Sequence, residues 1–157
     1  DARLFRQIIY NLLSNAIKYT PDGGEILIAS GQSLNGATTV EIRDSGVGIA
    51  PEDIERVQEP FGQARAHAEV THEGTGLGLS LSKKLMELQG GSLEIESEIG
   101  IGTTVILEFP PEKCPLRADK RQIQTAGLID KARDLLGIVN PFAGFGKYPH
   151  GQHHEHG

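Results

Sequence analysis

The sequence is poor in the residues that characterise secreted, membrane-spanning or nucleic-acid-binding proteins. Its single cysteine, Cys114, excludes an intramolecular disulfide framework and favours a reducing, cytosolic setting. No apolar run approaches the ~18 to 20 residues that span a bilayer, and no signal-peptide pattern opens the chain. Tryptophan is absent and aromatic residues make up 5%, so the core must be aliphatic. The net charge of -6 argues against a chain that binds nucleic acid as a whole.

The composition that remains suits one packed domain followed by a tail. Of the 157 residues, 38% are hydrophobic and 23% charged, which argues against wholesale disorder. Residues 1–110 carry 8 Lys and Arg against 16 Asp and Glu, whereas residues 111–157 carry 7 against 5. We therefore expect an acidic domain over 1–110 and a separate tail over 111–157. The tail has one amphipathic pattern, which predicts a helix over 118–136, and a His-rich end interpreted as a terminus without a role or an adventitious metal binder.

Hydrophobic periodicity predicts the elements of the domain. Apolar side chains recur at intervals of three and four over residues 1–19, where they form the wide stripe of one long helix. No period holds over 60–78, and a loop of that length inside a compact domain is more often functional than not. The other segments are predicted to be strands over 25–30, 38–44, 92–98 and 103–109, a short helix from Pro51, and a helix over 77–88. This order predicts an α+β fold, a two-layer sandwich with helices on one face of a mixed, mostly antiparallel sheet.

Three polar residues share one face of the first predicted helix. Asn11, Asn15 and Lys18 are spaced i, i+4 and i+7, so they project together, away from the apolar stripe. An amide oxygen is a hard ligand that Mg²⁺ accepts, and a lysine neutralises phosphate oxygens. The three residues therefore fit a metal-bound polyphosphate. The alternative is a solvated helix face, for which asparagine is a poor choice on propensity grounds.

Two glycine-containing segments also suit a nucleotide. Asp44 begins the sequence DSGVGI, where a carboxylate can accept a hydrogen bond from an amine such as that of adenine, and two glycines let the backbone approach a flat ring. An ordinary Asp-Ser-Gly turn is the alternative. The sequence GTGLGL at 74–79 leads into a helix, and its free N–H groups form an anion site. It has neither the Lys-Ser/Thr pair of a P-loop nor the preceding strand of a dinucleotide fingerprint.

The order of these motifs resembles the ATP-binding domain of sensor histidine kinases, within the superfamily shared with gyrase, heat-shock chaperone and mismatch-repair ATPases. NLLSNAIKYTP at 11–21 resembles the N box of that family, and DSGVGI at 44–49 resembles its G1 box. EPFGQ at 59–63 resembles the F box, GTGLGL at 74–79 the G2 box, and GIGTT at 100–104 the closing strand-pair motif. The resemblance covers the predicted domain and leaves the tail outside it.

The resemblance implies roles for the residues of the N box. Asn15 would coordinate a Mg²⁺ ion that bridges the ATP phosphates, and Asn11 would support the metal or phosphate environment. Lys18 would contact phosphate, and Tyr19 would lie near the ribose and phosphates.

The resemblance also implies how the base is held. Asp44 would bind the adenine amine, Gly48 and Ile49 would line the base pocket, and Thr103 would assist through water. Together, the implied nucleotide-binding residues are Asn11, Asn15, Lys18, Tyr19, Asp44, Gly46, Gly48, Ile49, Phe61, Gly74, Gly76, Leu77, Gly78, Leu79 and Thr103.

Residues 61–78 would form the ATP lid, with the amides of Gly76, Leu77 and Gly78 near the phosphates. Such lids often carry a cation that contacts the γ-phosphate, and Arg65 is the candidate here, ahead of the two lid histidines. The alternatives are that Phe61 only anchors the lid by packing and that Arg65 is simply solvated.

Position 11 separates branches of the superfamily. The hydrolysing branches resemble one another in having Glu there, and a carboxylate can act as a general base whereas Asn11 cannot. The resemblance thus implies a histidine kinase whose nucleophile, a histidine imidazole, lies on a separate helical-hairpin domain that also dimerises the kinase.

No His-Glu or His-Asp pattern of such a hairpin precedes Asp1, and by the resemblance we expect the nucleotide domain to lack its first strand. We therefore expect a fragment of a longer kinase that feeds a response regulator, cytoplasmic itself although the parent protein can be anchored in the inner membrane. A pseudokinase or scaffold of the same fold is the alternative, and a gyrase-type ATPase is disfavoured by Asn11 and by the short chain.

Overall fold

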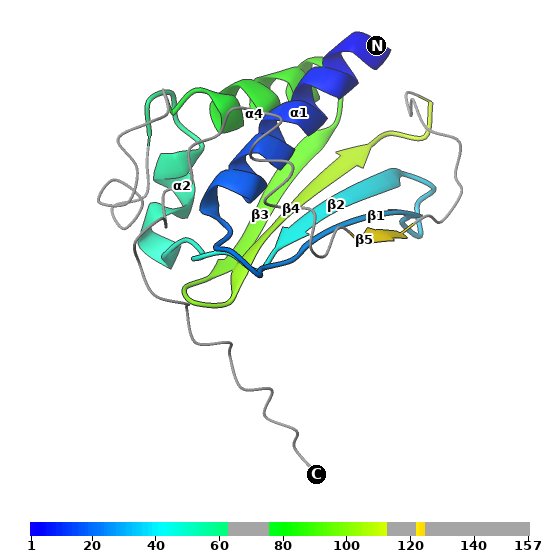
Figure 1. Ribbon diagram of the computed structural model, residues 1–157. Coiled ribbons are helices and arrows are strands. Elements are labelled where there is room, and N and C mark those ends of the chain that lie inside the picture. The colour runs from blue at the N-terminus through cyan, green and yellow to red at the C-terminus, as the bar shows by residue number, and fades with distance from the viewer. Residues whose placement is uncertain (63–75, 113–121, 125–157) are drawn as a thin grey trace.

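The computed structural model describes residues 1–62, 76–112 and 122–124 of the chain (Figure 1). In chain order its elements are α1 (Ala2–Tyr19), β1 (Ile26–Gln32), β2 (Thr38–Asp44), the 3-10 turn η1 (Pro51–Asp53), α2 (Ile54–Val57), α4 (Gly78–Leu88), β3 (Ser92–Glu98), β4 (Gly102–Phe109) and β5 (Gln122–Gln124). The strands form one sheet in the order β3-β4-β2-β1-β5. Each of the strand pairs described is antiparallel.

The molecule has two layers. Figure 1 shows α1 and α4 running across one face of the sheet, and the two helices pack against each other. This arrangement confirms the predicted α+β sandwich. Within the described residues, no helix has the length and hydropathy that crossing a bilayer requires.

The long first helix follows from its sequence signals. The side chain of Asp1 accepts a hydrogen bond of 2.8 Å from the backbone N–H of Arg3, which satisfies one of the free donors of the first turn. At the other end Thr20 is extended, with φ -101°. Pro21 follows, and a proline disfavours the helical conformation in the residue before it. The helix therefore stops where the turn residues begin.

The core lies between the two helices and the covered face of the sheet. It is aliphatic, as expected from the composition, apart from Met86 and Phe109. The ring of Phe5 meets that of Phe109 edge to face at a centroid distance of 5.7 Å. The buried members of the core are Ile8, Leu12, Ala16, Ile17, Ile26, Val40, Ile42, Met86, Leu93, Leu107 and Phe109.

The strands match the predicted ones to within one residue at each end, except at the end of β1. The predicted strand over 25–30 continues to Gln32, because Gly31 and Gln32 remain paired with Thr39 and Thr38. The hairpin connection is thus shorter than expected. It is closed by a hydrogen bond of 2.9 Å from the Ser33 N–H to the Ala37 carbonyl.

The predicted helix over 118–136 is wrong at residues 122–124, which form the strand β5. This strand pairs with Leu27, Ile28 and Ala29 of β1. Without a partner, the outer edge of β1 would expose unpaired N–H and C=O groups, and backbone pairing outweighs a weak amphipathic pattern. The other residues of that predicted helix lie outside the described part of the chain.

We expect Leu107→Ala to lower the free energy of unfolding by about 2 to 5 kcal/mol, because it removes a side chain that is 0% exposed at the centre of the core. Urea denaturation measures the change. Leu88→Ala is the matched control, since Leu88 is 76% exposed at the end of α4. Equal losses in the two variants would show that the core is not where the structure places it.

Candidate functional site

A cavity of about 260 Å³, called the central cavity below, lies between α1, the covered face of the sheet and the beginning of α4. Asn15, Asp44 and Gly76, which come from three different predicted motifs, all line it. Three segments distant in sequence therefore converge on one hollow. The predicted nucleotide-binding residues that line the central cavity are Asn15, Lys18, Tyr19, Asp44, Gly48, Ile49, Gly76, Gly78, Leu79 and Thr103.

The other predicted residues do not line the cavity or lie outside the described residues. Four of these residues are described but do not line the cavity: Asn11, Gly46, Phe61 and Leu77. The amide nitrogen of Asn11 instead faces the Gly78 carbonyl and the Ser82 hydroxyl of α4, at 3.5 and 3.4 Å. Gly74 and the candidate γ-phosphate contact Arg65, like His67 and His72, belong to the segment that the structure does not describe.

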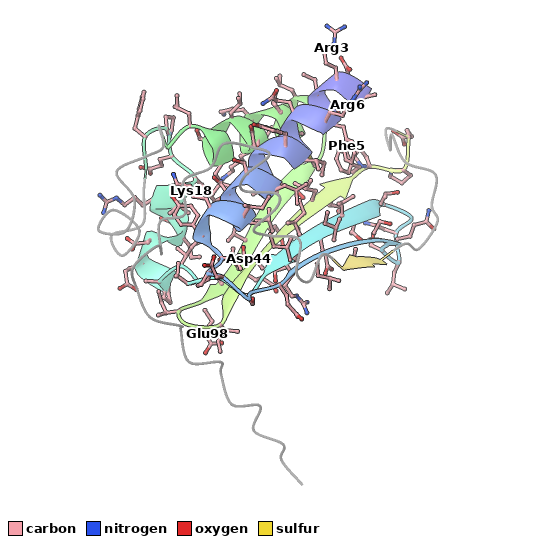
Figure 2. The ribbon with its side chains drawn as sticks, viewed as in Figure 1. Arg3, Phe5, Arg6, Lys18, Asp44 and Glu98 are labelled. Atoms are coloured by element: carbon pink, nitrogen blue, oxygen red, sulfur yellow. The ribbon has the colours of Figure 1, made fainter. Side chains whose placement is uncertain are left out.

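The last two turns of α1 supply polar groups to the cavity. The half-buried Asn15 makes no side-chain hydrogen bond within the described residues, so its amide is available to a ligand. The ammonium of Lys18 lies 5.3 Å from the ring centroid of Tyr19, a cation–π contact that holds the lysine beside the cavity. Figure 2 shows Lys18 and Asp44 at the end of the sandwich opposite to Arg3 and Arg6.

Besides Lys18, the beginning of α4 is a second place at the cavity where a negative charge would be stabilised. Leu77 occupies the N-cap position and makes no side-chain capping hydrogen bond, and the first turn has no acidic residue. The backbone N–H groups of a first helical turn lack partners inside the helix, and the helix dipole favours an anion beside them. Gly76 and Gly78 bring this turn to the cavity wall.

Asp44 stands at the end of β2, where its carboxyl group joins two neighbouring segments. Its Oδ1 accepts hydrogen bonds from the backbone N–H groups of Gly46 at 2.9 Å and Thr103 at 3.2 Å. Its Oδ2 makes no hydrogen bond within the described residues. Burial raises the pKa of Asp44 to about 6, and the two backbone hydrogen bonds only partly oppose this. A carboxylate poised in this way can accept a hydrogen bond from a ligand.

Glycines allow the turn after Asp44 to pack on the hairpin between β3 and β4. Gly48 has a φ of +75°, and a Cβ atom there would lie 2.0 Å from the carbonyl oxygen of Glu98. The Gly100 N–H donates a hydrogen bond of 2.9 Å to the Val47 carbonyl. A Cβ atom at Gly102 would lie 1.9 Å from the Asp44 carbonyl oxygen. The hairpin therefore fixes the position of the aspartate-bearing turn.

Several residues of the site were not predicted. Part of the apolar lining comes from Ile42, Ile95 and Val105 on the strands and from Val57 on α2, of which Ile42 and Val57 are buried. The alternation of apolar residues in β2, β3 and β4 could have found the first three. Ser97, described below, carries no sequence signal beyond its position on the inner face of β3.

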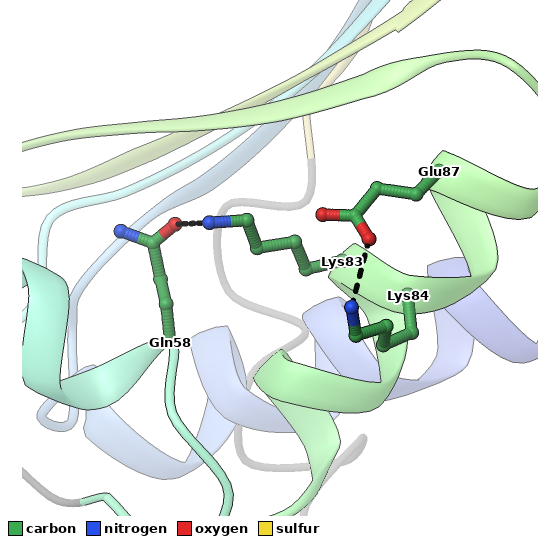
Figure 3. Close-up of polar contacts among 4 residues, drawn as sticks. All are labelled: Gln58, Lys83, Lys84 and Glu87. Atoms are coloured by element: carbon green, nitrogen blue, oxygen red, sulfur yellow. Dashed lines mark hydrogen bonds and ion pairs between the residues drawn. The ribbon is translucent and has the colours of Figure 1, made fainter.

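The two ends of the segment between α2 and α4 meet beside the cavity. The Phe61 N–H donates a hydrogen bond of 3.1 Å to the Gly76 carbonyl. In Figure 3 the ammonium of Lys83 on α4 donates to the Gln58 amide oxygen at 3.2 Å, which ties the same two regions together. The neighbouring pair of Lys84 and Glu87, 3.1 Å apart, is exposed and contributes little.

This geometry can be compared with known proteins. Residues 1–113 match the family model described as histidine kinase-, DNA gyrase B-, and HSP90-like ATPase. The chain belongs to this ATPase family. The match covers every described residue that lines the central cavity.

Two curated relatives of this chain are histidine kinases. The chain is 44% identical over 118 residues to the histidine protein kinase DivJ of Caulobacter vibrioides, covering 75% of the chain and 19% of the relative. It is 36% identical over 121 residues to the cell-division control histidine kinase PdhS of Brucella abortus, covering 72% and 12%. The chain thus spans a fifth or less of the length of these relatives.

Solved structures point to the same branch of the family. The mycobacterial sensor histidine kinase MprB aligns with a TM-score of 0.61 at 28% identity, over 70% of this chain and 72% of that one. Full-length ShkA in complex with AMPPNP aligns with a TM-score of 0.59 at 31% identity, over 73% of this chain and 23% of that one. The resemblance to the ATP-binding domain of histidine kinases is therefore confirmed.

The raised pKa of Asp44 predicts a stability effect that depends on pH. A raised folded-state pKa gives stability that is present below pH 3.8 and is lost as the pH rises through about 6. In Asp44→Asn the amide oxygen can keep both backbone hydrogen bonds and carries no charge. We expect the free energy of unfolding of the variant, relative to that of the wild type, to rise by about 1 to 3 kcal/mol as the pH increases from 4 to 8. Urea denaturation at a series of pH values measures this difference. A stability difference that stays constant with pH would contradict the assignment.

Proposed function

We propose that this domain binds Mg-ATP in the central cavity and presents it for phosphoryl transfer to a histidine on a separate helical-hairpin domain. The observation that carries the proposal is that Asn15, Lys18 and Asp44 line one cavity together with the beginning of α4. Among the described lining residues, Lys18 and Asp44 are the charged ones. One cation and one carboxylate with apolar walls between them suit a ligand with a phosphate tail and an amine-bearing flat base.

In this proposal Asp44 recognises the adenine amine. Its Oδ1 is engaged by the backbone, which leaves Oδ2 as the acceptor for an external N–H group. Ile49 and the apolar lining residues would cover the faces of the base, and Gly48 would let the backbone approach it closely. Thr103, whose N–H already contacts Asp44, would assist either directly or through water.

The phosphates would lie toward α1 and α4. Lys18 would neutralise phosphate oxygens, and the N–H groups of the first turn of α4 would donate to them. Tyr19 would lie near the ribose and phosphates through its contact with Lys18. Gly74 and Arg65 keep their proposed roles at the lid, Arg65 as a contact of the γ-phosphate.

The donor set also suits Mg²⁺. The described residues contain no group of three or more His, Cys, Asp or Glu side chains that could hold a metal ion. An ion here would take most of its ligands from phosphate and water, which is the usual coordination of Mg²⁺ beside polyphosphates. Asn15 offers the amide oxygen for one further bond, and the ion would supply neutralisation of phosphate charge.

Asn11 bears on the type of reaction. Its amide contacts α4 instead of lining the cavity, and an amide cannot take a proton from water as a general base. The domain would therefore position ATP for a nucleophile supplied elsewhere, with an imidazole nitrogen attacking the γ-phosphorus as ADP leaves. The phosphoacceptor domain of a parent kinase would be its direct partner and a response regulator its indirect one, in the cytoplasm.

We expect Asp44→Asn to weaken Mg-ATP binding by roughly 5- to 150-fold, because the amide presents N–H groups to the adenine amine in place of an acceptor. Isothermal titration calorimetry of the purified chain measures the affinity. Glu41→Gln is the matched control, since Glu41 lies on the same strand but on the opposite face of the sheet. Unchanged affinity in Asp44→Asn removes the aspartate from the base site, and no binding by the wild type favours the scaffold alternative.

We expect the chain to transfer the γ-phosphoryl group of radiolabelled ATP to a separately expressed helical hairpin that carries a phosphoacceptor histidine. The label should be stable to base and labile to acid, as a phosphoramidate is, and EDTA should abolish the transfer by removing Mg²⁺. A hairpin with His replaced by Gln is the control. ATP binding without transfer would favour a pseudokinase that acts through protein contacts.

A further inference from the structure

Three side chains form a row across the strands at the Asp44 end of the cavity. Thr103 of β4 is paired with Asp44 of β2 on one side and with Ser97 of β3 on the other. All three face the helix layer, as their strand alternation requires. Asp44 and Thr103 line the cavity, whereas Ser97, beside Thr103 on the neighbouring strand, is not among the lining residues.

The Ser97 hydroxyl makes three polar contacts. It accepts a hydrogen bond of 2.7 Å from the backbone N–H of Ile49. It lies 3.0 Å from the carbonyl oxygen of Gly102 and 2.7 Å from the Thr103 hydroxyl oxygen. A hydroxyl has one proton to donate and two lone pairs to accept with, so these three contacts can saturate it.

The direction of the Ser97–Thr103 hydrogen bond follows from the carbonyl. The Gly102 oxygen can only accept, so the single proton of Ser97 must point to it for that contact to be a hydrogen bond. Thr103 must then donate its own proton to Ser97. The opposite direction would leave the Ser97 and Gly102 oxygens facing each other without a proton. All three contacts are hydrogen bonds only when Thr103 donates to Ser97 and Ser97 donates to the Gly102 carbonyl.

With its proton engaged, Thr103 can only accept from a ligand. The cavity then presents two adjacent acceptors, the Thr103 hydroxyl and the Asp44 Oδ2 atom. A 6-amino purine offers N–H groups to such a pair. A carboxylate alone discriminates poorly, because a 6-oxo purine can turn its N1–H toward Asp44. Its O6 atom would then meet Thr103, and two acceptors facing each other are unfavourable.

We propose that Ser97 is a positioning residue that fixes the Thr103 hydroxyl as an acceptor and thereby makes the cavity select 6-amino over 6-oxo purine nucleotides. The proposal rests on the proposed function, since it assumes that the base lies beside Asp44. Ser97 itself need not touch the ligand. Its effect is carried by the orientation of one proton on Thr103.

The test compares Mg-ATP and Mg-ITP, which differ in the 6-position, by calorimetric titration of the purified chain. The wild type should bind ATP more tightly than ITP. In Ser97→Ala the Thr103 hydroxyl is free to turn its proton to O6, so the ratio of the ITP to the ATP dissociation constant should fall roughly three- to tenfold, as expected for one neutral hydrogen bond. Ser97→Thr keeps the hydroxyl and should keep the ratio.

A double-mutant cycle shows that the effect passes through Thr103. Thr103→Val should lower the ratio by itself, and adding Ser97→Ala should then change it no further. Ser92→Ala, at the exposed far end of the same strand, is the control. If Ser97→Ala fails to fold, Thr103→Val and Ser97→Thr still carry the test.

The results that would overturn this proposal are distinguishable from a failure of the proposed function. A wild type that binds ATP and ITP equally, or a ratio that stays unchanged in folded Ser97→Ala, excludes the selection by Ser97 while leaving ATP binding intact. A wild type that binds neither nucleotide excludes the proposed function itself.

Discussion

The hydrogen bonds that the Asp44 carboxyl group accepts from Gly46 and Thr103 hold the site together. They join the end of β2, the turn that follows it and the beginning of β4, so three segments share one oxygen atom. Burial of the carboxyl group raises its pKa to about 6, although the two backbone hydrogen bonds partly oppose the rise. Such a group costs stability at neutral pH, which is typical of residues kept for binding and not for folding.

The rest of the architecture places complementary chemistry around that carboxyl group. The sheet supplies apolar side chains below the cavity, and α1 supplies an amide and an ammonium from its last two turns. The first turn of α4 adds backbone N–H groups that have no partner within the helix and no side-chain cap among the described residues. Because α1 packs against both the sheet and α4, one helix fixes the distance between Asp44 and the beginning of α4.

Much of the fold could be predicted because its signals are local. The stripe of α1 and the alternation in β2, β3 and β4 identify the elements, and ordered motifs identify the convergence of Asn15, Asp44 and Gly76. The position of Asn11 could not be predicted, because its contact with α4 spans 67 residues of sequence. The strand at 122–124 depends on an open edge of β1, which no local pattern at those residues reports.

The hydrogen bond between the Phe61 N–H and the Gly76 carbonyl holds together the two ends of the segment between them. Because this hydrogen bond closes the chain into a loop, increasing the number of residues between Phe61 and Gly76 adds only slowly to the entropy cost of closing the loop. Doubling that number costs about 0.6 kcal/mol. Insertions and deletions between these two residues can therefore leave the closing contact itself, and with it the beginning of α4, in place.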